Sequence, residues 1–198
     1  MINLKDLVFT QNNLISKEYC KYFIDFFENN KDKLEQENSL TYNDNKDTKN
    51  SLNKCMVLNL SKYQKQQKFK KPLSFALHYT DIIIKNYVNY LKVNISKNIP
   101  NHFMKFTDNV RIIKYEEGGY IDDHLDIDNF LARDVRASCT LNLNDNYEGG
   151  SFNFFEKKYQ LKLKEGQGLI FPADQYWIHG TSPVIKGNRY SINCFIKP

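Results

Sequence analysis

Residues 135–155 read VRASCTLNLNDNYEGGSFNFF, and this stretch decides the fold. Two runs rich in β-branched, aromatic and other apolar residues, Val135–Leu143 and Ser151–Phe155, flank a segment made of Asn, Asp, Tyr, Glu and Gly. Short runs of this kind bounded by turn-forming residues are typical of antiparallel strands. The stretch therefore predicts two short strands separated by turns.

The same pattern continues outward through residues 106–198. Further strands are predicted over Val110–Tyr115, Tyr120–Leu125, Tyr159–Leu163, Gly168–Phe171, Trp177–His179 and Tyr190–Ile196. No helical segment alternates with these runs, which argues against a parallel sheet. Eight short strands with tight turns predict an antiparallel sandwich or barrel of the jelly-roll kind.

In the first half of the chain the apolar residues recur at helical spacing, so this half is predicted to be mainly helical. Ser16 can cap a helix in which Tyr19, Phe23 and Phe27 recur at helical spacing, and Pro72 can start a second helix. Between them, the polar residues 38–53 predict a loop.

A short strand is expected over Cys55–Leu60, followed by the basic stretch Lys62–Lys71, which we interpret as a solvated, mobile segment rather than a nucleic-acid contact. We therefore expect one domain over 1–198, with 1–105 providing helical support and loops and 106–198 forming the β core.

Composition excludes several classes of protein. The 198 residues are 41% hydrophobic and 14% aromatic, which excludes a disordered tail and a collagen-like repeat. The net charge of +5 indicates a lysine-rich surface, with a nucleic-acid or acidic partner as the less favoured alternative. The four cysteines lie far apart and are expected to be free, and Cys139 and Cys194 fall in apolar runs. No signal peptide or membrane span is visible, so a cytoplasmic protein without membrane contact is expected.

The triplet His124-Leu125-Asp126 is the first sign of chemistry. In an extended chain, residues i and i+2 point to the same side, so an imidazole nitrogen and a carboxylate oxygen can meet on one ion. An acidic surface turn is the plain alternative, because Asp122, Asp123 and Asp128 lie nearby. A calcium loop is excluded, because the glycine and the glutamate that such a loop needs are missing.

His179 is the further histidine that falls in a strand-like run of the second half. Two imidazoles and one carboxylate on one side of a metal form the facial triad of mononuclear non-haem Fe(II) oxygenases. Arg189 follows one strand later, and a guanidinium in such a cavity needs an anion, for which a carboxylate has the matching geometry. Ser191 points to the same side and could share that carboxylate.

From Val110 to its C-terminus the chain resembles the 2-oxoglutarate- and Fe(II)-dependent dioxygenases, in particular the prolyl 4-hydroxylase-like group. The matching segments, in order, are Lys114-Tyr115, a glycine at 118 or 119, His124-Leu125-Asp126, residues 136–144, Tyr147-Glu148-Gly149-Gly150-Ser151-Phe152, Gly166, Phe171-Pro172, Ile178-His179-Gly180, Pro183-Val184 and Gly187-Asn188-Arg189-Tyr190-Ser191. Each segment alone is weak evidence for the family, but the occurrence of all of them in this order is specific for it.

The resemblance implies a double-stranded β-helix with N-terminal helices packed against its major sheet. By the same resemblance, His124, Asp126 and His179 take the positions of the metal ligands, and Arg189 that of the residue that binds the far carboxylate of 2-oxoglutarate. Tyr115 matches a tyrosine of the cosubstrate pocket, and Thr140 lies on a strand that lines it. Asn142 departs from the pattern, since many relatives carry an aromatic residue near that place.

The implied activity is hydroxylation of a prolyl or other side chain of a peptide or protein. Fe(II) is the implied cofactor, 2-oxoglutarate and O₂ are the cosubstrates, succinate and CO₂ are the co-products, and ascorbate is a possible addition. One rival is a nucleic-acid-modifying dioxygenase, but its alkylation-repair members carry an arginine where this chain has Phe195. The other is a jelly-roll binding protein without turnover. The substrate and the oligomeric state stay open.

Overall fold

The computed structural model describes residues 3–36, 55–127 and 134–198. Its main layer is a seven-stranded antiparallel sheet with the order β1-β9-β5-β12-β4-β3-β2. In that order the strands are Phe9–Gln11, Gly168–Pro172, Ala137–Asn142, Arg189–Lys197, Phe106–Tyr115, Cys55–Asn59 and Glu35–Gln36. The long strands β4 and β12 lie at the centre and pair along most of their length.

Two small antiparallel sheets complete the β structure. One has the order β10-β7-β8 and comprises His179–Thr181, Phe152–Phe154 and Tyr159–Leu161; the other pairs β11, Val184–Lys186, with β6, Glu148–Gly149. Phe152 and Phe154 of β7 pack against Leu169 and Phe171 of β9 in a shared aromatic core, which joins the small sheet to the main one. The main sheet and the small sheets together form the double-stranded β-helix that the sequence predicted.

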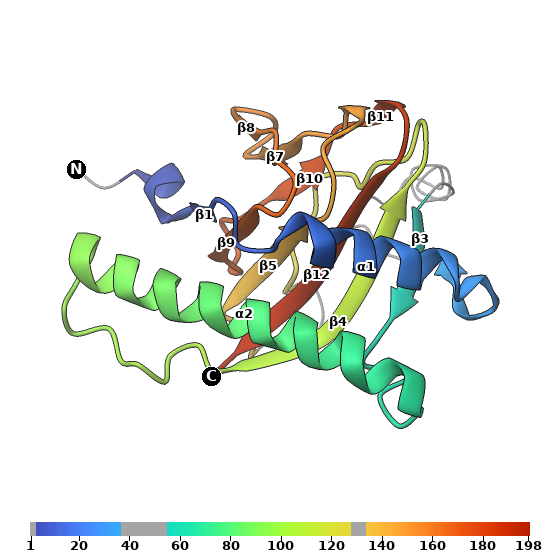
Figure 1. The fold of residues 1–198 in the computed structure, drawn as a ribbon. Helices are drawn as coiled ribbons and strands as arrows, with labels where there is room; N and C mark the ends of the chain where they lie inside the picture. The colour runs from blue at the N-terminus through green and yellow to red at the C-terminus, as the bar shows by residue number, and fades with distance from the viewer. Residues whose placement is uncertain (1–2, 37–54, 128–133) are drawn as a thin grey trace.

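Two helices cover one face of the main sheet, as Figure 1 shows. Helix α1 spans Lys17–Glu28 and helix α2 spans Gln67–Asn94, with short 3-10 turns at Leu4–Leu7 and Lys31–Lys33. Ser16 caps α1 as expected, since its hydroxyl accepts the amide hydrogen of Tyr19. Phe23 and Phe27 of α1 belong to the same buried core as Leu141 and Ile192 of the sheet. Burial of this apolar face is what holds the helices on the sheet.

Helix α2 begins five residues earlier than the sequence predicted. Its first residue is Gln67, so Pro72 lies inside the helix rather than at its start. Pro72 has no amide hydrogen to donate to the preceding turn, which normally disfavours this position. The packing of Phe69 explains the difference, because this fully buried ring contacts Phe26 and Tyr63 and fixes the first turn. Burial therefore outweighs the local preference.

The predicted strand over Tyr120–Leu125 is also wrong. The described residues between β4 and β5 form turns and loop, apart from a single antiparallel bridge between His124 and His179. The predicted strand Trp177–His179 is displaced, since β10 begins at His179. The segment Tyr120–Leu125 is a poor candidate for a continuous strand, because it contains two aspartates and follows Gly118, which has a positive φ.

Other expectations have mixed outcomes. All four cysteines are free and buried, as predicted. The basic stretch Lys62–Lys71 is a turn followed by the start of α2; it is mostly exposed, as expected for a solvated segment, and its Lys62 pairs with Glu35. The loop predicted over 38–53 lies outside the described residues. None of the described helices is both long and apolar enough to cross a membrane.

Candidate metal centre

The backbone brings His124 and His179 together although they are far apart in the sequence. Their amide and carbonyl groups exchange two hydrogen bonds, of 2.8 and 3.0 Å, in the isolated bridge. A bridge of this kind places the two side chains next to each other, and their ring centroids are 4.4 Å apart. Asp126 follows on the same loop, two residues after His124, so three functional side chains converge.

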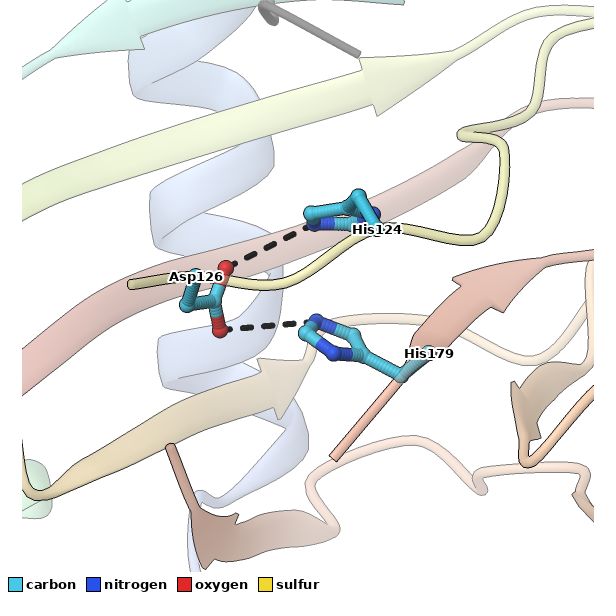
Figure 2. A group of neighbouring side chains, drawn as sticks. All are labelled: His124, Asp126 and His179. Atoms are coloured by element: carbon cyan, nitrogen blue, oxygen red, sulfur yellow. Dashed lines mark ion pairs between the residues drawn. The ribbon is translucent and has the colours of Figure 1, made fainter. Parts of the chain in front are cut away.

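The three side chains point their ligand atoms at a common centre, as Figure 2 shows. The Nε2 atom of His124 lies 3.5 Å from Asp126 Oδ1, and the Nε2 atom of His179 lies 3.4 Å from Asp126 Oδ2. One ligand atom from each residue lies within 4.8 Å of the others. First-row metal ions bind imidazole nitrogen and carboxylate oxygen at about 2.0–2.2 Å, so one ion can reach all three.

Hydrogen bonds on the far side of each ring set the orientation of the two imidazoles. The Nδ1 atom of His124 lies 2.8 Å from the carbonyl oxygen of Asp122, and that of His179 lies 2.9 Å from the carbonyl oxygen of Trp177. A carbonyl oxygen only accepts, so each Nδ1 carries the hydrogen and each Nε2 presents its lone pair. This is the tautomer that a metal ligand requires.

Asp126 is held as a carboxylate. Its burial favours the neutral acid, but the neighbouring His179 and His124 and a hydrogen bond from Ser138 favour the charged form more strongly, so its pKa lies well below the ordinary value. The Ser138 hydroxyl donates to Asp126 Oδ2, which also fixes the orientation of the carboxylate. A charged, oriented carboxylate is ready to bind a cation.

His179 is held neutral by its surroundings. Burial lowers its pKa to about 4, although Asp126 opposes this shift, so the ring is uncharged at neutral pH. Phe152 stacks on the ring at 5.5 Å between centroids, and Phe171 meets it edge to face at 4.7 Å. Trp177 lies in the same aromatic core, as expected for a packing residue. A neutral imidazole in a rigid aromatic wall is a preorganised ligand.

Arg189, the first residue of β12, lies on the cavity side of the main sheet and is only 1% exposed. Its Nε donates to Asn142 Oδ1 at 3.4 Å, and its guanidinium lies 5.0 Å from the centre of the Tyr115 ring. Its Nη1 atom is buried with no hydrogen-bond partner. A buried guanidinium with an unused donor is costly unless an anion meets it. The site therefore fits the far carboxylate of 2-oxoglutarate.

The remaining predicted residues share the cavity face of the sheet. Thr140 lies between Ser138 and Asn142 on β5, and alternation puts all three side chains on one face. Ser191 is opposite Asn142 in the register of β12 with β5, and its hydroxyl donates to Asn193 Oδ1 at 2.7 Å. Tyr115 is opposite Arg189 in the register of β12 with β4. The structure thus places Arg189, Ser191, Tyr115 and Thr140 on one face of the main sheet, opposite the helices.

Sequence reasoning missed two supporting residues, Ser138 and Asn142. Asn142 is fully buried, and its amide donates to the carbonyl oxygens of Asn144, Leu163 and Lys164, which turns its own oxygen toward Arg189. The strict alternation of polar and apolar residues in Ala137–Asn142 was the available signal. It marks every second residue of this strand as facing something other than apolar core.

Comparisons with known proteins agree with this geometry. Residues 110–197 match the model of the 2OG-Fe(II) oxygenase superfamily. No curated protein matches the chain by sequence.

Solved structures share the fold at low identity. A Trichoplax adhaerens prolyl hydroxylase, solved with a hypoxia inducible factor peptide fragment, has a TM-score of 0.68 at 15% identity and covers 97% of this chain and 84% of its own. A Pseudomonas putida prolyl-4-hydroxylase gives 0.67 at 12% identity, covering 96% and 92%. The viral collagen prolyl hydroxylase of Paramecium Bursaria Chlorella virus-1, solved with 2-oxoglutarate, gives 0.60 at 15% identity, covering 96% and 95%. Residues 110–197 are therefore similar to the 2OG-Fe(II) oxygenase superfamily, and the fold of the chain is prolyl 4-hydroxylase-like.

Proposed function

We propose that the protein hydroxylates a prolyl side chain, or a related side chain, of a peptide or protein. His124, Asp126 and His179 would hold Fe(II), and Arg189 would bind the far carboxylate of 2-oxoglutarate. Tyr115, Thr140 and Ser191 would line the cosubstrate pocket. The observation that carries the proposal is the convergence of Nε2, Nε2 and carboxylate atoms within 4.8 Å, together with a buried arginine, Arg189, whose Nη1 has no hydrogen-bond partner.

The residues of the chain have distinct tasks in this proposal. Bound iron supplies the oxidative chemistry, with 2-oxoglutarate and O₂ consumed and succinate and CO₂ released. The two imidazoles and Asp126 would supply three ligands to the metal, and the cosubstrates would complete its coordination. Arg189 orients 2-oxoglutarate by its far end, and Phe152 and Phe171 keep water away from His179.

The substrate class rests on the structural relatives. The solved neighbours include prolyl hydroxylases, one of them with a peptide bound, which supports a peptide or protein as the substrate. We further propose that 1–198 act as one domain, with 1–105 supporting the catalytic core formed by 106–198. A role for ascorbate and a cytoplasmic location stay predictions.

Succinate release is the first test. Protein supplied with Fe(II) and 2-oxoglutarate should release succinate, and His179→Ala should release none because the metal loses a ligand. Binding of Mn(II) should be weakened in the same variant, which reports on the site without turnover. Equal succinate release from both proteins would contradict the metal assignment.

The substrate is tested by mass spectrometry. Proline-rich peptides and oligonucleotides are incubated with the active protein, and the gain of one oxygen atom or the loss of a methyl group is measured. We expect oxygen gain on a peptide and no change in the oligonucleotides. Reaction confined to oligonucleotides would overturn the prolyl proposal in favour of nucleic-acid modification.

A further inference from the structure

A second buried donor lies beside Arg189 and has no task in the function proposed so far. Among the described residues, Tyr147 Oη and Arg189 Nη1 are both buried polar atoms without a hydrogen-bond partner. Tyr147 is 6% exposed and precedes the short strand β6. Buried hydroxyl groups are nearly always satisfied, so an unpaired one needs a reason.

Packing places the Tyr147 and Arg189 side chains close together. Tyr147 belongs to a buried cluster with Cys55 and Val57 of β3 and with Tyr115 of β4, whose ring lies against the Arg189 guanidinium. Gly150 shows how close the neighbours are. A Cβ atom at this glycine would lie 2.9 Å from Tyr147 Cε2 and 3.4 Å from Arg189 Cδ, so the tyrosine ring and the arginine chain flank one point.

Lys162 covers the Tyr147 ring. Its Nζ atom lies 3.5 Å from the ring centre and donates to the carbonyl oxygens of Tyr147 and Gly149. Burial lowers the pKa of Lys162, and the positive charge of Arg189 lowers it further, because the two cations repel each other. The surroundings of the Tyr147 and Arg189 side chains are therefore positive, and two donors there lack an acceptor.

We propose that Tyr147 is a cosubstrate-binding residue whose hydroxyl donates, together with Arg189 Nη1, to the far carboxylate of 2-oxoglutarate. The inference rests on the function proposed above and adds a residue to its site. A carboxylate only accepts hydrogen bonds and has two oxygens, so it can satisfy both donors at once. The unpaired hydroxyl is then a feature of the ligand-free protein, and binding removes the penalty.

The test compares two keto acids that differ only at the far end. Calorimetric titrations of Mn(II)-loaded wild-type protein and of Tyr147→Phe are made with 2-oxoglutarate and with 2-oxopentanoate, which has a methyl group in place of the far carboxylate. Since a hydrogen bond to a charged group is lost, Tyr147→Phe should bind 2-oxoglutarate about 10- to 150-fold more weakly. Its affinity for 2-oxopentanoate should equal that of the wild type.

Tyr87→Phe is the matched control. Tyr87 is also buried, but its hydroxyl donates to the carbonyl oxygen of Leu7 on the helix-covered side, so neither affinity should change. Thermal unfolding without ligand adds a second readout. Tyr147→Phe should unfold at the wild-type temperature or above it, because an unpaired polar atom is removed, whereas Tyr87→Phe should unfold at a lower temperature.

Two outcomes would overturn the inference. One is unchanged 2-oxoglutarate affinity in Tyr147→Phe, and the other is an equal loss for both keto acids, which would indicate a general change of the fold. Failure of the proposed function itself looks different. In that case the wild-type protein would bind the two keto acids equally or bind neither.

Discussion

The two faces of the main sheet differ sharply although the same strands make both. On β5, Ala137, Cys139 and Leu141 belong to the core under the helices, whereas Ser138, Thr140 and Asn142 face the cavity. All six side chains are buried. One face is apolar and packed, and the other is polar and binds Asp126 and Arg189 through hydrogen bonds.

This difference separates folding from function within a single strand. Apolar burial contributes roughly 25 cal/mol per Å², so the helix-covered face stabilises the protein. Buried polar groups contribute little net stability and are costly when unpaired, as Arg189 Nη1 and Tyr147 Oη are. Substitutions on the helix-covered face should therefore lower stability, whereas substitutions on the opposite face should mainly weaken binding.

The largest expected effect is on the helix-covered face. Leu141→Ala should lower the free energy of unfolding by about 2–5 kcal/mol, because it leaves a cavity in a closed core. Denaturant unfolding measures this loss, and 2-oxoglutarate affinity per folded molecule should stay near the wild-type value. The adjacent Thr140→Val is the control, with a small effect on unfolding. Equal destabilisation by both would erase the distinction between the faces.

Arg189→Ala should give a large loss of cosubstrate affinity. Removal of the guanidinium should weaken 2-oxoglutarate binding by about 1.5–3 kcal/mol, or about 10- to 150-fold. Titration of the Mn(II)-loaded protein measures the affinity, and Arg189→Lys should recover part of it through its charge. Unchanged affinity in Arg189→Ala would mean that another group holds the carboxylate.

Ser138→Ala should affect the metal rather than the cosubstrate. The hydroxyl orients the Asp126 carboxylate, and loss of such a partner costs about 10- to 100-fold in metal affinity. Competition titration with a chelator measures this change. Stability should be little affected, and Ser138→Thr should restore most of the affinity. A wild-type metal affinity in Ser138→Ala would show that Asp126 is oriented by the histidines alone.

The smallest expected effect concerns Tyr190, on the helix-covered side. Its hydroxyl donates to Glu28 Oε1 at 2.6 Å and joins β12 to α1. Because Glu28 is partly exposed, Tyr190→Phe should cost about 1 kcal/mol of unfolding free energy at neutral pH.

The stability loss in Tyr190→Phe should depend on pH, because the hydrogen bond needs Glu28 in its charged form. Burial alone would raise the pKa of Glu28, but the hydrogen bonds from Tyr190 and Lys114 hold it below its ordinary value. A carboxylate whose pKa is lower in the folded than in the unfolded state stabilises the protein at pH values above the unfolded-state pKa. This stabilisation is lost as the pH falls through the folded-state pKa. The difference in unfolding free energy between the wild type and Tyr190→Phe should therefore become smaller as the pH is lowered through the acidic range. A constant difference would rule out Glu28 as the partner.

The sequence by itself determined the class of fold and the chemistry of the site. The short apolar runs such as Val135–Leu143 predict an antiparallel β core, and the spacing of His124 and Asp126 predicts two ligands on one side. Both are local patterns, and local patterns are readable because side-chain direction has a fixed period. The sequence positions of His179 and Arg189 made them candidate partners, and the resemblance assigned their roles.

Only the tertiary structure decided how these residues are supported. Phe69 moves the start of α2 ahead of Pro72 through packing with residues distant in sequence. His124 meets His179 through a single bridge rather than through the predicted strand. Asn142 turns toward Arg189 because three carbonyl groups from other segments hold its amide. Such contacts join segments far apart in the chain, so no local pattern encodes them.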